Sequence, residues 1–317
     1  MTDMTDMTAT SRPSIADKRR RFHDLHAQGC FVIPNPWDVG SALYLQSLGF
    51  KALASTSAGF AWSIGRRDNG VDRDAMLAHL HDLVEVTDVP INADFEKGFA
   101  NDAAGVAESV RLAVEAGVAG LSIEDSTGEA AQPLFALDEA VLRLRAARQA
   151  IDAQGGDTLL VGRAECFLVG RPDLDETIAR LQAYANAGAD CLYAPGVADP
   201  AQIAAIVAAV APKPVNLLVG GPSALTVAEI AALGVRRISV GGALARCAWG
   251  GFMQAAQALA EQGSFAGLAT GAPGKVLNGL FSPSAQIERS GIPLLPVQPG
   301  GQTATLEVVN AIRDASS

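Results

Sequence analysis

The chain has 317 residues, of which 49% are hydrophobic and 5% aromatic, so it is long enough to bury one large core. A formal net charge of −10 argues against nucleic-acid binding through a positive field. No apolar run is long enough for a membrane span, and the opening residues, MTDMTDMTATSRPS, lack the apolar region of a secretory signal. We therefore expect neither a nucleic-acid nor a membrane partner.

The cysteines indicate a reducing compartment. None of the four belongs to a CxxC pair, and three of them lie in or beside strand-like runs, where a thiol behaves as a small hydrophobe. The four are Cys30, Cys166, Cys191 and Cys247. We expect no disulfides, a cytoplasmic location, and a flexible arm over residues 1–20.

Short β-branched runs alternate with helical segments along the chain. The expected strands are Cys30–Asn35, Ala52–Ser57, Pro90–Asp94, Ala119–Asp125, Thr158–Glu165, Ala189–Ala194, Pro214–Val219 and Arg236–Gly241. Between them, segments such as Asp102–Ala116 and Leu174–Ala187 place apolar residues on one helical stripe. Four helices end in a glycine just before the next strand: Gly49, Gly117, Gly188 and Gly234.

Eight such units predict an α/β fold, a closed (β/α)8 TIM-type barrel over residues 21–265, with an open doubly wound sheet as the alternative. The absence of GxGxxG after the first expected strand weakens that alternative. Residues 266–317 are rich in Gly and Pro and are expected to form a C-terminal helical extension used in oligomer contacts. Within the extension, Thr303–Ala315 could form a short helix.

Carboxylates end two of the expected strands. Asp94 and Glu96 follow the third run, and Glu124 and Asp125 follow the fourth. Unpaired acids at the ends of buried strands are costly, and a hard divalent cation with oxygen ligands would neutralise them. The alternative is that these acids cap the helices that follow. Their presence on two strands together favours the metal.

In a barrel, the βα ends of all strands meet on one rim, so further polar groups are expected beside these acids. Arg163 can bind a substrate carboxylate in bidentate fashion, or it can form a structural salt bridge with Glu165 or Glu124. The Ser57-Ala58-Gly59 turn can present backbone amides to an anion, or it can be an ordinary turn of small residues.

Other catalytic arrangements have no support in the sequence. The four histidines fall in helical segments away from the strand ends: His23, His26, His79 and His81. A histidine base or a zinc site is therefore not expected, and no GxSxG elbow is present. Carboxylates with Mg²⁺ would instead polarise a carbonyl and stabilise an enolate oxygen, which suits a small 2-oxo acid.

The motifs TSAGFAWSIGRRD, PINADFEKGF, GLSIEDS, VGRAECFL and VGG resemble the isocitrate lyase/phosphoenolpyruvate mutase superfamily from about Phe31 to Phe281. The resemblance implies a (β/α)8 barrel, dependence on Mg²⁺ (with Mn²⁺ as a substitute), and 2-oxo acid or enolate chemistry on a small-molecule carboxylate. It also implies a homotetramer, a dimer of dimers that exchange the last barrel helix.

The resemblance assigns a metal site. Asp94 and Glu96 occupy the Asp-x-Asp metal positions, written here as Asp-x-Glu, and Glu124 matches the glutamate of the Glu-Asp motif. Asp68 matches an aspartate that joins the metal shell through water. Glu124, Asp68 and Arg163 are the expected catalytic residues.

The resemblance also assigns substrate contacts. Ser57 and Ala58 resemble a turn whose amides bind a substrate carboxylate, and Arg163 matches the arginine of an Ala-Arg-Thr-Asp motif. Asn216 resembles an asparagine near the substrate in some lyases.

The loop after the fourth strand departs from the family pattern. Lyases carry a Lys-Lys-Cys-Gly-His loop whose cysteine donates a proton, whereas residues 126–136 read STGEAAQPLFA, and Pro195-Gly196 replaces a glutamate. The mutases carry a basic, asparagine-containing stretch there, which is also missing. The proton donor stays open among Glu129, Tyr193, Asp125 and water.

Three functions are weighed. The first is a Mg²⁺-dependent lyase that cleaves or forms a C–C bond in a small 2-oxo or 2-hydroxy acid through a metal-stabilised enolate. The second is a phosphonomutase or phosphonate hydrolase acting on a P–C bond, for which Arg66, Arg67 and Lys97 are the nearby cations. The third is a non-catalytic barrel that binds a metabolite at Gly220-Gly221 and Gly241-Gly242.

Overall fold

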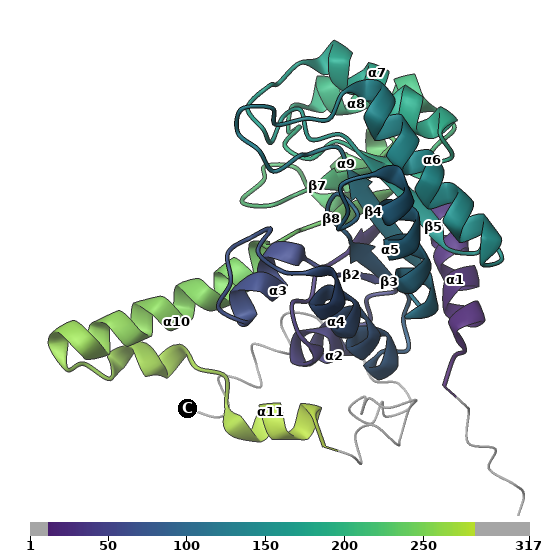
Figure 1. The fold of residues 1–317 in the computed structure, drawn as a ribbon. Helices are drawn as coiled ribbons and strands as arrows, with labels where there is room; N and C mark the ends of the chain where they lie inside the picture. The colour runs from purple at the N-terminus through teal and green to yellow at the C-terminus, as the bar shows by residue number, and fades with distance from the viewer. Residues whose placement is uncertain (1–11, 283–317) are drawn as a thin grey trace, which may run out of the picture. The chain divides into compact units, whose positions relative to one another are not determined.

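A computed structural model describes residues 12–282, and the chain divides into two compact units, residues 1–271 and residues 272–317. In the first unit, helices surround a central set of strands (Figure 1). No helix within the described residues is long and apolar enough to cross a membrane.

Eight parallel strands form one sheet in the order β1-β8-β7-β6-β5-β4-β3-β2. They are β1 (Phe31–Ile33), β2 (Leu53–Ala54), β3 (Ile91–Asp94), β4 (Gly120–Glu124), β5 (Leu159–Arg163), β6 (Cys191–Tyr193), β7 (Val215–Leu218) and β8 (Arg237–Ser239). The two ends of this order meet where the Ala54 amide donates to the Pro34 carbonyl at 3.1 Å. The predicted barrel and all eight predicted strands are therefore confirmed, with the observed strands shorter than the sequence runs.

Helices separate the strands. They are α1 (Ile15–Ala27), α2 (Val39–Ser47), α3 (Ser57–Ser63), α4 (Arg73–Val86), α5 (Ala103–Glu115), α6 (Leu137–Ala153), α7 (Leu174–Asn186), α8 (Pro200–Val210), α9 (Val227–Ala232) and α10 (Ala243–Gln262), followed by the short 3-10 helix η1 (Ala266–Thr270). Helix α1 begins inside the arm expected to be flexible, because Ser14 and Asp17 cap each other's backbone in a capping box.

The residues of each strand divide between two environments. Side chains such as Leu121 and Leu160 pack outward against the helices in the main hydrophobic core. On the inner side, Phe22 of α1 closes the amino-terminal end of the barrel, where it packs with Ile33 and Leu159. Since strand residues alternate between faces, the inward positions above this plug are the ones available for a site.

The lower interior holds a buried arginine among neutral groups. Arg237 of β8 is 2% exposed; its Nε donates to Asn216 Oδ1 at 2.8 Å and its Nη1 donates to Asn92 Oδ1 at 3.2 Å. His26 Nε2 lies 3.5 Å from the same Nη1. Together they form what we call the lower polar layer: Arg237, Asn92, Asn216 and His26.

Helix α10 extends away from the barrel instead of covering it (Figure 1). Of its residues, Ala245 is buried, whereas Phe252 is 62% and Met253 60% exposed. The second unit contains α11 (Gly274–Leu280) within its described part. The helix expected over Thr303–Ala315 lies outside the described residues.

Candidate active site

The strand register brings the predicted residues of β4 and β5 together. Glu124 pairs in register with Arg163, which in turn pairs with Tyr193 on β6. The Glu124 amide also donates to the Glu96 carbonyl at 3.0 Å, so the residues that follow β3 lie at the same level. The carboxyl ends of four neighbouring strands, β3 to β6, thus contribute side chains to one end of the barrel.

Arg163 is the centre of this group. Its Nη1 lies 3.1 Å from Asp94 Oδ1 and 3.3 Å from Glu124 Oε2, and its Nε pairs with Glu165. The guanidinium also lies over the Tyr193 ring, 5.1 Å from its centroid. Of the two interpretations left open by the sequence, the salt bridges to Glu124 and Glu165 are present, and they do not exclude contact with a substrate.

Negative charge exceeds positive charge around Arg163. Burial raises the pKa of Glu124 well above its ordinary value, and burial followed by the charge of Asp94 raises the pKa of Glu96 to about 7. Burial also raises the pKa of Glu165. Burial alone would lower the pKa of Arg163, but the charges of Glu165 and Glu124 hold it well above its ordinary range. One guanidinium therefore faces several carboxylates that are costly to ionise.

Asp94 is held by the turn that was expected to bind substrate. The Ser57 amide and hydroxyl both donate to Asp94 Oδ2 at 2.9 Å, and the Asp94 amide donates to Ser55 Oγ at 2.8 Å. Ser57 and Ala58 are the first two residues of α3, with Thr56 as the N-cap. Ser57 therefore orients Asp94, and a substrate contact by Ala58 stays a prediction.

Two predicted residues lie at the margins of the group. Asp68 is in the exposed loop before α4, where desolvation and the charge of Asp94 raise its pKa, so the two carboxylates are within electrostatic range. Asn216 is 1% exposed and donates to Ser239 Oγ at 2.9 Å while it accepts from Arg237. Its amide is used in the lower polar layer, so its role in substrate binding stays a prediction.

The carboxylates of the site include one with an unpartnered oxygen. Glu96 Oε1 is buried and has no hydrogen-bond partner, and Glu96 takes a left-handed backbone conformation, with φ of 48°. Oxygen donors with an unsatisfied buried carboxylate are what a hard divalent cation requires. Among residues 12–282, no group of three or more His, Cys, Asp or Glu side chains is already arranged to hold one. The residue types therefore fit a divalent cation, although Asp94 and Glu124 are ion-paired with Arg163 in this structure.

The loop after β4 is held by hydrogen bonds between its own residues. Ser126 pairs with Leu134 in an antiparallel bridge, and the Thr127 amide donates to the Pro133 carbonyl at 3.0 Å. Lys97 Nζ donates to the Thr127 carbonyl at 2.8 Å, which commits one of the three predicted cations to this loop. Arg66 donates to the Gly70 carbonyl and pairs with Asp72, which commits a second.

Among the candidate proton donors, the structure separates three side chains. Glu129 is exposed in the loop, and Asp125 is 2% exposed with both oxygens hydrogen-bonded. Tyr193 lies against Arg163, and burial raises its pKa to about 12. Tyr193 is therefore the candidate that belongs to the site itself.

Glu165 and Ser55 lie at the ends of expected strands, on the rim where polar groups were expected, but no role in the site was predicted for either. Glu165 was weighed as a salt-bridge partner of Arg163; it is 5% exposed and lies two residues beyond it. Ser55 positions the Asp94 backbone from the neighbouring strand end. This contact could not be found from the residue types, because it depends on the pairing of β2 with β3.

Comparison with known proteins identifies the family of the chain. The family model described as phosphoenolpyruvate phosphomutase matches residues 22–260. The chain is 32% identical to an oxaloacetate decarboxylase of Paraburkholderia xenovorans over 70% of its own length and 74% of that protein. The crystal structure of a Burkholderia cenocepacia J2315 protein, provisionally named a lyase/mutase, is 49% identical with a TM-score of 0.82, covering 85% of this chain and 98% of that one.

A further solved structure identifies the superfamily. A crystal structure of 2,3-dimethylmalate lyase, a PEP mutase/isocitrate lyase superfamily member, is 26% identical with a TM-score of 0.74, covering 85% of this chain and 95% of that one. The chain belongs to the phosphoenolpyruvate phosphomutase family, within this superfamily. It is an enzyme of the lyase and phosphonomutase class, which confirms the resemblance noted from the motifs.

Proposed function

We propose that the protein is a divalent-metal-dependent lyase that cleaves or forms a C–C bond in a small 2-oxo or 2-hydroxy acid through a metal-stabilised enolate. The observation that carries this proposal is the group formed by Arg163 with Asp94, Glu124 and Glu165 at the barrel end. A guanidinium that faces surplus carboxylates can exchange one of them for a substrate carboxylate once a cation neutralises the others.

Asp94, Glu96 and Glu124 are the residues that would hold the metal, and we propose Mg²⁺, with Mn²⁺ as a substitute. A bound divalent cation would act as a Lewis acid on the 2-oxo or 2-hydroxy oxygen of the substrate. Ser57 keeps Asp94 oriented through two hydrogen bonds, and Asp68 adds negative charge nearby.

The chain's own groups account for the rest of the reaction. With a 2-oxo acid, Arg163 would bind the substrate carboxylate and stabilise the negative charge that develops as the bond between C3 and its substituent breaks and the electron pair forms an enolate with its charge on the 2-oxo oxygen. The Tyr193 hydroxyl would donate a proton to the carbon that loses its substituent, since Tyr193 lies against Arg163. The barrel wall around Tyr193 is apolar, with Val161, Cys191 and Leu218, and excludes water from the reacting atoms.

P–C bond chemistry is the second candidate, since the matching family model carries the name of a mutase. It needs cations for the phosphoryl group, and two of the three that the sequence offers, Lys97 and Arg66, are committed to backbone carbonyls. This disfavours P–C chemistry. The third candidate, a barrel that binds a metabolite without catalysis, would use the cavity lined by Gly220 and Gly221. This cavity has a volume of about 620 Å³, and its other lining residues are mainly apolar. Arg246 is the one charged side chain among its lining residues, so it offers little to hold an anionic metabolite.

The test is turnover with Mg²⁺ of oxaloacetate, 2-methylisocitrate and related 2-oxo and 2-hydroxy acids, with phosphonopyruvate assayed separately. We expect release of pyruvate, glyoxylate or CO₂ from one of the carbon acids, loss of that activity on chelation with EDTA, and its return with Mg²⁺ or Mn²⁺. Tyr193→Phe should retain substrate binding but lower kcat by about a hundredfold. Turnover of phosphonopyruvate alone would remove the C–C lyase proposal.

We also propose that α10 packs on a second copy of this chain, in a dimer of dimers. Its exposed residues include the large apolar side chains of Phe252 and Met253. Exposed apolar faces of this kind are commonly buried against another subunit. Light scattering should give a tetramer, and Phe252→Glu should give smaller species at the same concentration. A monomeric wild type would contradict the proposal.

The four free thiols support a cytoplasmic location, which we retain as a proposal.

A further inference from the structure

Asp125 follows Glu124 of the candidate site, and its carboxylate contacts helix α7 and the backbone that follows β5. It is 2% exposed; its Oδ1 accepts from the Glu165 amide at 2.8 Å, and its Oδ2 accepts from the Tyr184 hydroxyl at 2.5 Å. Arg180 Nη1 lies 3.1 Å from the same Oδ2. One carboxylate thus connects the ends of β4 and β5 with helix α7.

Helix α7 reaches Asp125 because β5 carries a glycine beneath it. A Cβ at Gly162 would lie 2.8 Å from the Tyr184 Cβ, which is closer than real Cβ contacts allow. Any larger residue at position 162 would push α7 off the strand and separate Tyr184 from Asp125. The contact of the helix with the buried acid is therefore fixed by the sequence of β5.

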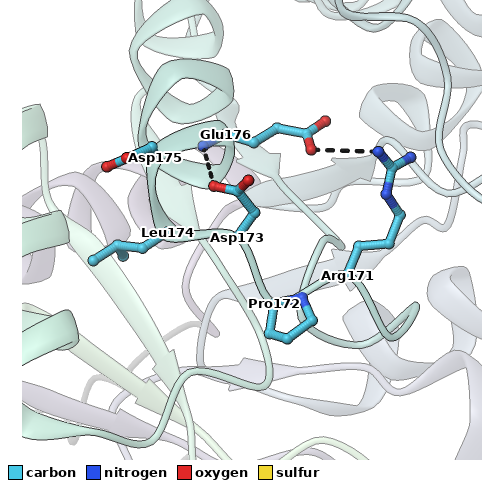
Figure 2. A pocket seen from close by; sticks show the side chains of 6 residues that line it. All are labelled: Arg171, Pro172, Asp173, Leu174, Asp175 and Glu176. Carbon is cyan, nitrogen blue, oxygen red and sulfur yellow. Dashed lines mark hydrogen bonds and ion pairs between the residues drawn. The ribbon is translucent and has the colours of Figure 1, made fainter.

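The network continues outward to the surface. Arg180 Nε and Nη2 lie 3.0 and 2.8 Å from Glu176 Oε1, and Arg180 Nη1 donates to the Phe135 carbonyl at 3.1 Å, at the end of the β4 loop. Glu176 also pairs with Arg171 at 3.7 Å across a surface pocket of about 730 Å³ at the start of α7 (Figure 2). Asp173 caps the helix there through the Glu176 amide, at 2.9 Å.

The network continues inward to Arg163. The Glu165 amide is bound by Asp125, the Glu165 carboxylate pairs with Arg163 Nε, and Arg163 Nη1 meets Asp94 and Glu124. The Asp125 amide also donates to the Arg163 carbonyl at 3.2 Å. The backbone from the Arg163 carbonyl to the Glu165 amide is thus held by Asp125, whose own ion pair is with Arg180.

We propose that Asp125 is a positioning residue for catalysis, which acts through Glu165 to set the orientation of Arg163, with Tyr184 and Arg180 holding Asp125 in place. This inference rests on the proposed function in taking Arg163 as the group that binds the substrate carboxylate. A misplaced guanidinium loses more interaction with the transition state than with the ground state, because the negative charge on the substrate beyond that of its carboxylate develops only as the bond breaks.

The test compares two variants that each remove one buried hydroxyl. Tyr184→Phe removes the hydrogen bond to Asp125, and Thr87→Val removes the Thr87 Oγ1 hydrogen bond to the Leu83 carbonyl, 2.7 Å long, beyond the end of α4. We expect Tyr184→Phe to lower kcat by about tenfold with KM changed less than about twofold. Thr87→Val should lower the melting temperature without altering kcat. Equal kcat values for the two variants would make Asp125 a residue of the fold alone and overturn the inference.

A second variant and a second readout separate this inference from the proposed function. Glu176→Gln changes the outer, partly exposed end of the network and should lower kcat in the same sense but by less, about twofold. A crystal structure of Asp125→Asn should show Arg163 moved from Glu165, whatever the substrate proves to be. If the wild type turns over none of the carbon acids and Arg163 still moves, the proposed function fails and the positioning role stands. If Arg163 keeps its contacts in Asp125→Asn, the positioning role is overturned.

Discussion

The barrel buries two arginines on its inner side, and their neighbours differ. Arg163, near the carboxyl ends of the strands, is paired with three acids, whereas Arg237 in the lower polar layer is hydrogen-bonded to the amides of Asn92 and Asn216. Burial lowers the pKa of Arg237, while the surrounding acids raise that of Arg163. Arginine therefore has two different environments in this barrel. Arg237 belongs to a network of neutral hydrogen-bonding groups, and Arg163 belongs to a cluster of carboxylates.

The difference shows what the charge imbalance is for. Arg237 donates from its Nε and Nη1 to neutral amides, and the four residues of the lower polar layer include no carboxylate that could bind a cation. Around Arg163, burial and mutual repulsion raise the pKa values of several carboxylates, and Glu96 keeps an unpartnered oxygen. Such a site becomes more stable when it binds a cation, which is the property that a metal-dependent enzyme requires.

The largest expected effect is at Glu124. Glu124→Gln removes one charge from the group around Arg163 while it preserves shape, and we expect kcat to fall by about three orders of magnitude. Circular dichroism and melting should show a folded protein of wild-type stability or higher, because a carboxylate with a raised pKa has been neutralised. A variant with near-normal kcat would reduce Glu124 to a structural ion-pair partner of Arg163.

The next effect concerns the lower polar layer. Asn92→Leu removes the acceptor at 3.2 Å from Arg237 Nη1 and leaves a buried charged donor with one partner fewer. We expect the free energy of unfolding to fall by about 2 kcal/mol, with kcat and KM of the folded enzyme unchanged. Denaturant titration and steady-state kinetics measure the two quantities. A parallel loss of kcat would mean that the two layers work as one.

The effect that is smallest at neutral pH is the pH dependence of stability contributed by His26. Burial, followed by the charge of Arg237, lowers the pKa of His26 from 6.5 to about 3. The unfolded chain therefore binds a proton that the folded one refuses, so stability is complete above about pH 6.5 and falls by about 1.4 kcal/mol per pH unit on acidification toward pH 3. His26→Gln should reduce this slope in denaturant titrations at several pH values. His23→Gln, exposed on the same helix, is the control, and equal slopes for both variants would contradict the assignment.

The sequence could predict the fold because its signals are local. Each glycine such as Gly117 or Gly188 ends a helix at a positive φ before a strand, and alternation of strands and helices leaves few topologies. The acids Asp94 and Glu124 were found for the same reason, since both end a strand. The predicted arm over residues 1–20 did not anticipate the capping box at Ser14 that starts α1.

What could not be predicted depends on contacts between distant segments. The use of Ser57 by Asp94 requires the pairing of β2 with β3, and the burial of Asn216 beside Arg237 requires the register of β7 with β8. The role of Asp125 depends on helix α7, whose approach is set by Gly162. None of these contacts can be predicted from the residue types alone, because each depends on which segments pack together.

The junction between β1 and β2 has a consequence for how the barrel moves. These two strands stand at opposite ends of the sheet order, and the Ala54–Pro34 hydrogen bond joins their ends. β2 has two residues and leads directly into the α3 turn that holds Asp94. The barrel therefore has its weakest junction next to the end that carries the candidate site, and thermal opening there would loosen Asp94 while leaving the opposite wall, β5 and β6, closed.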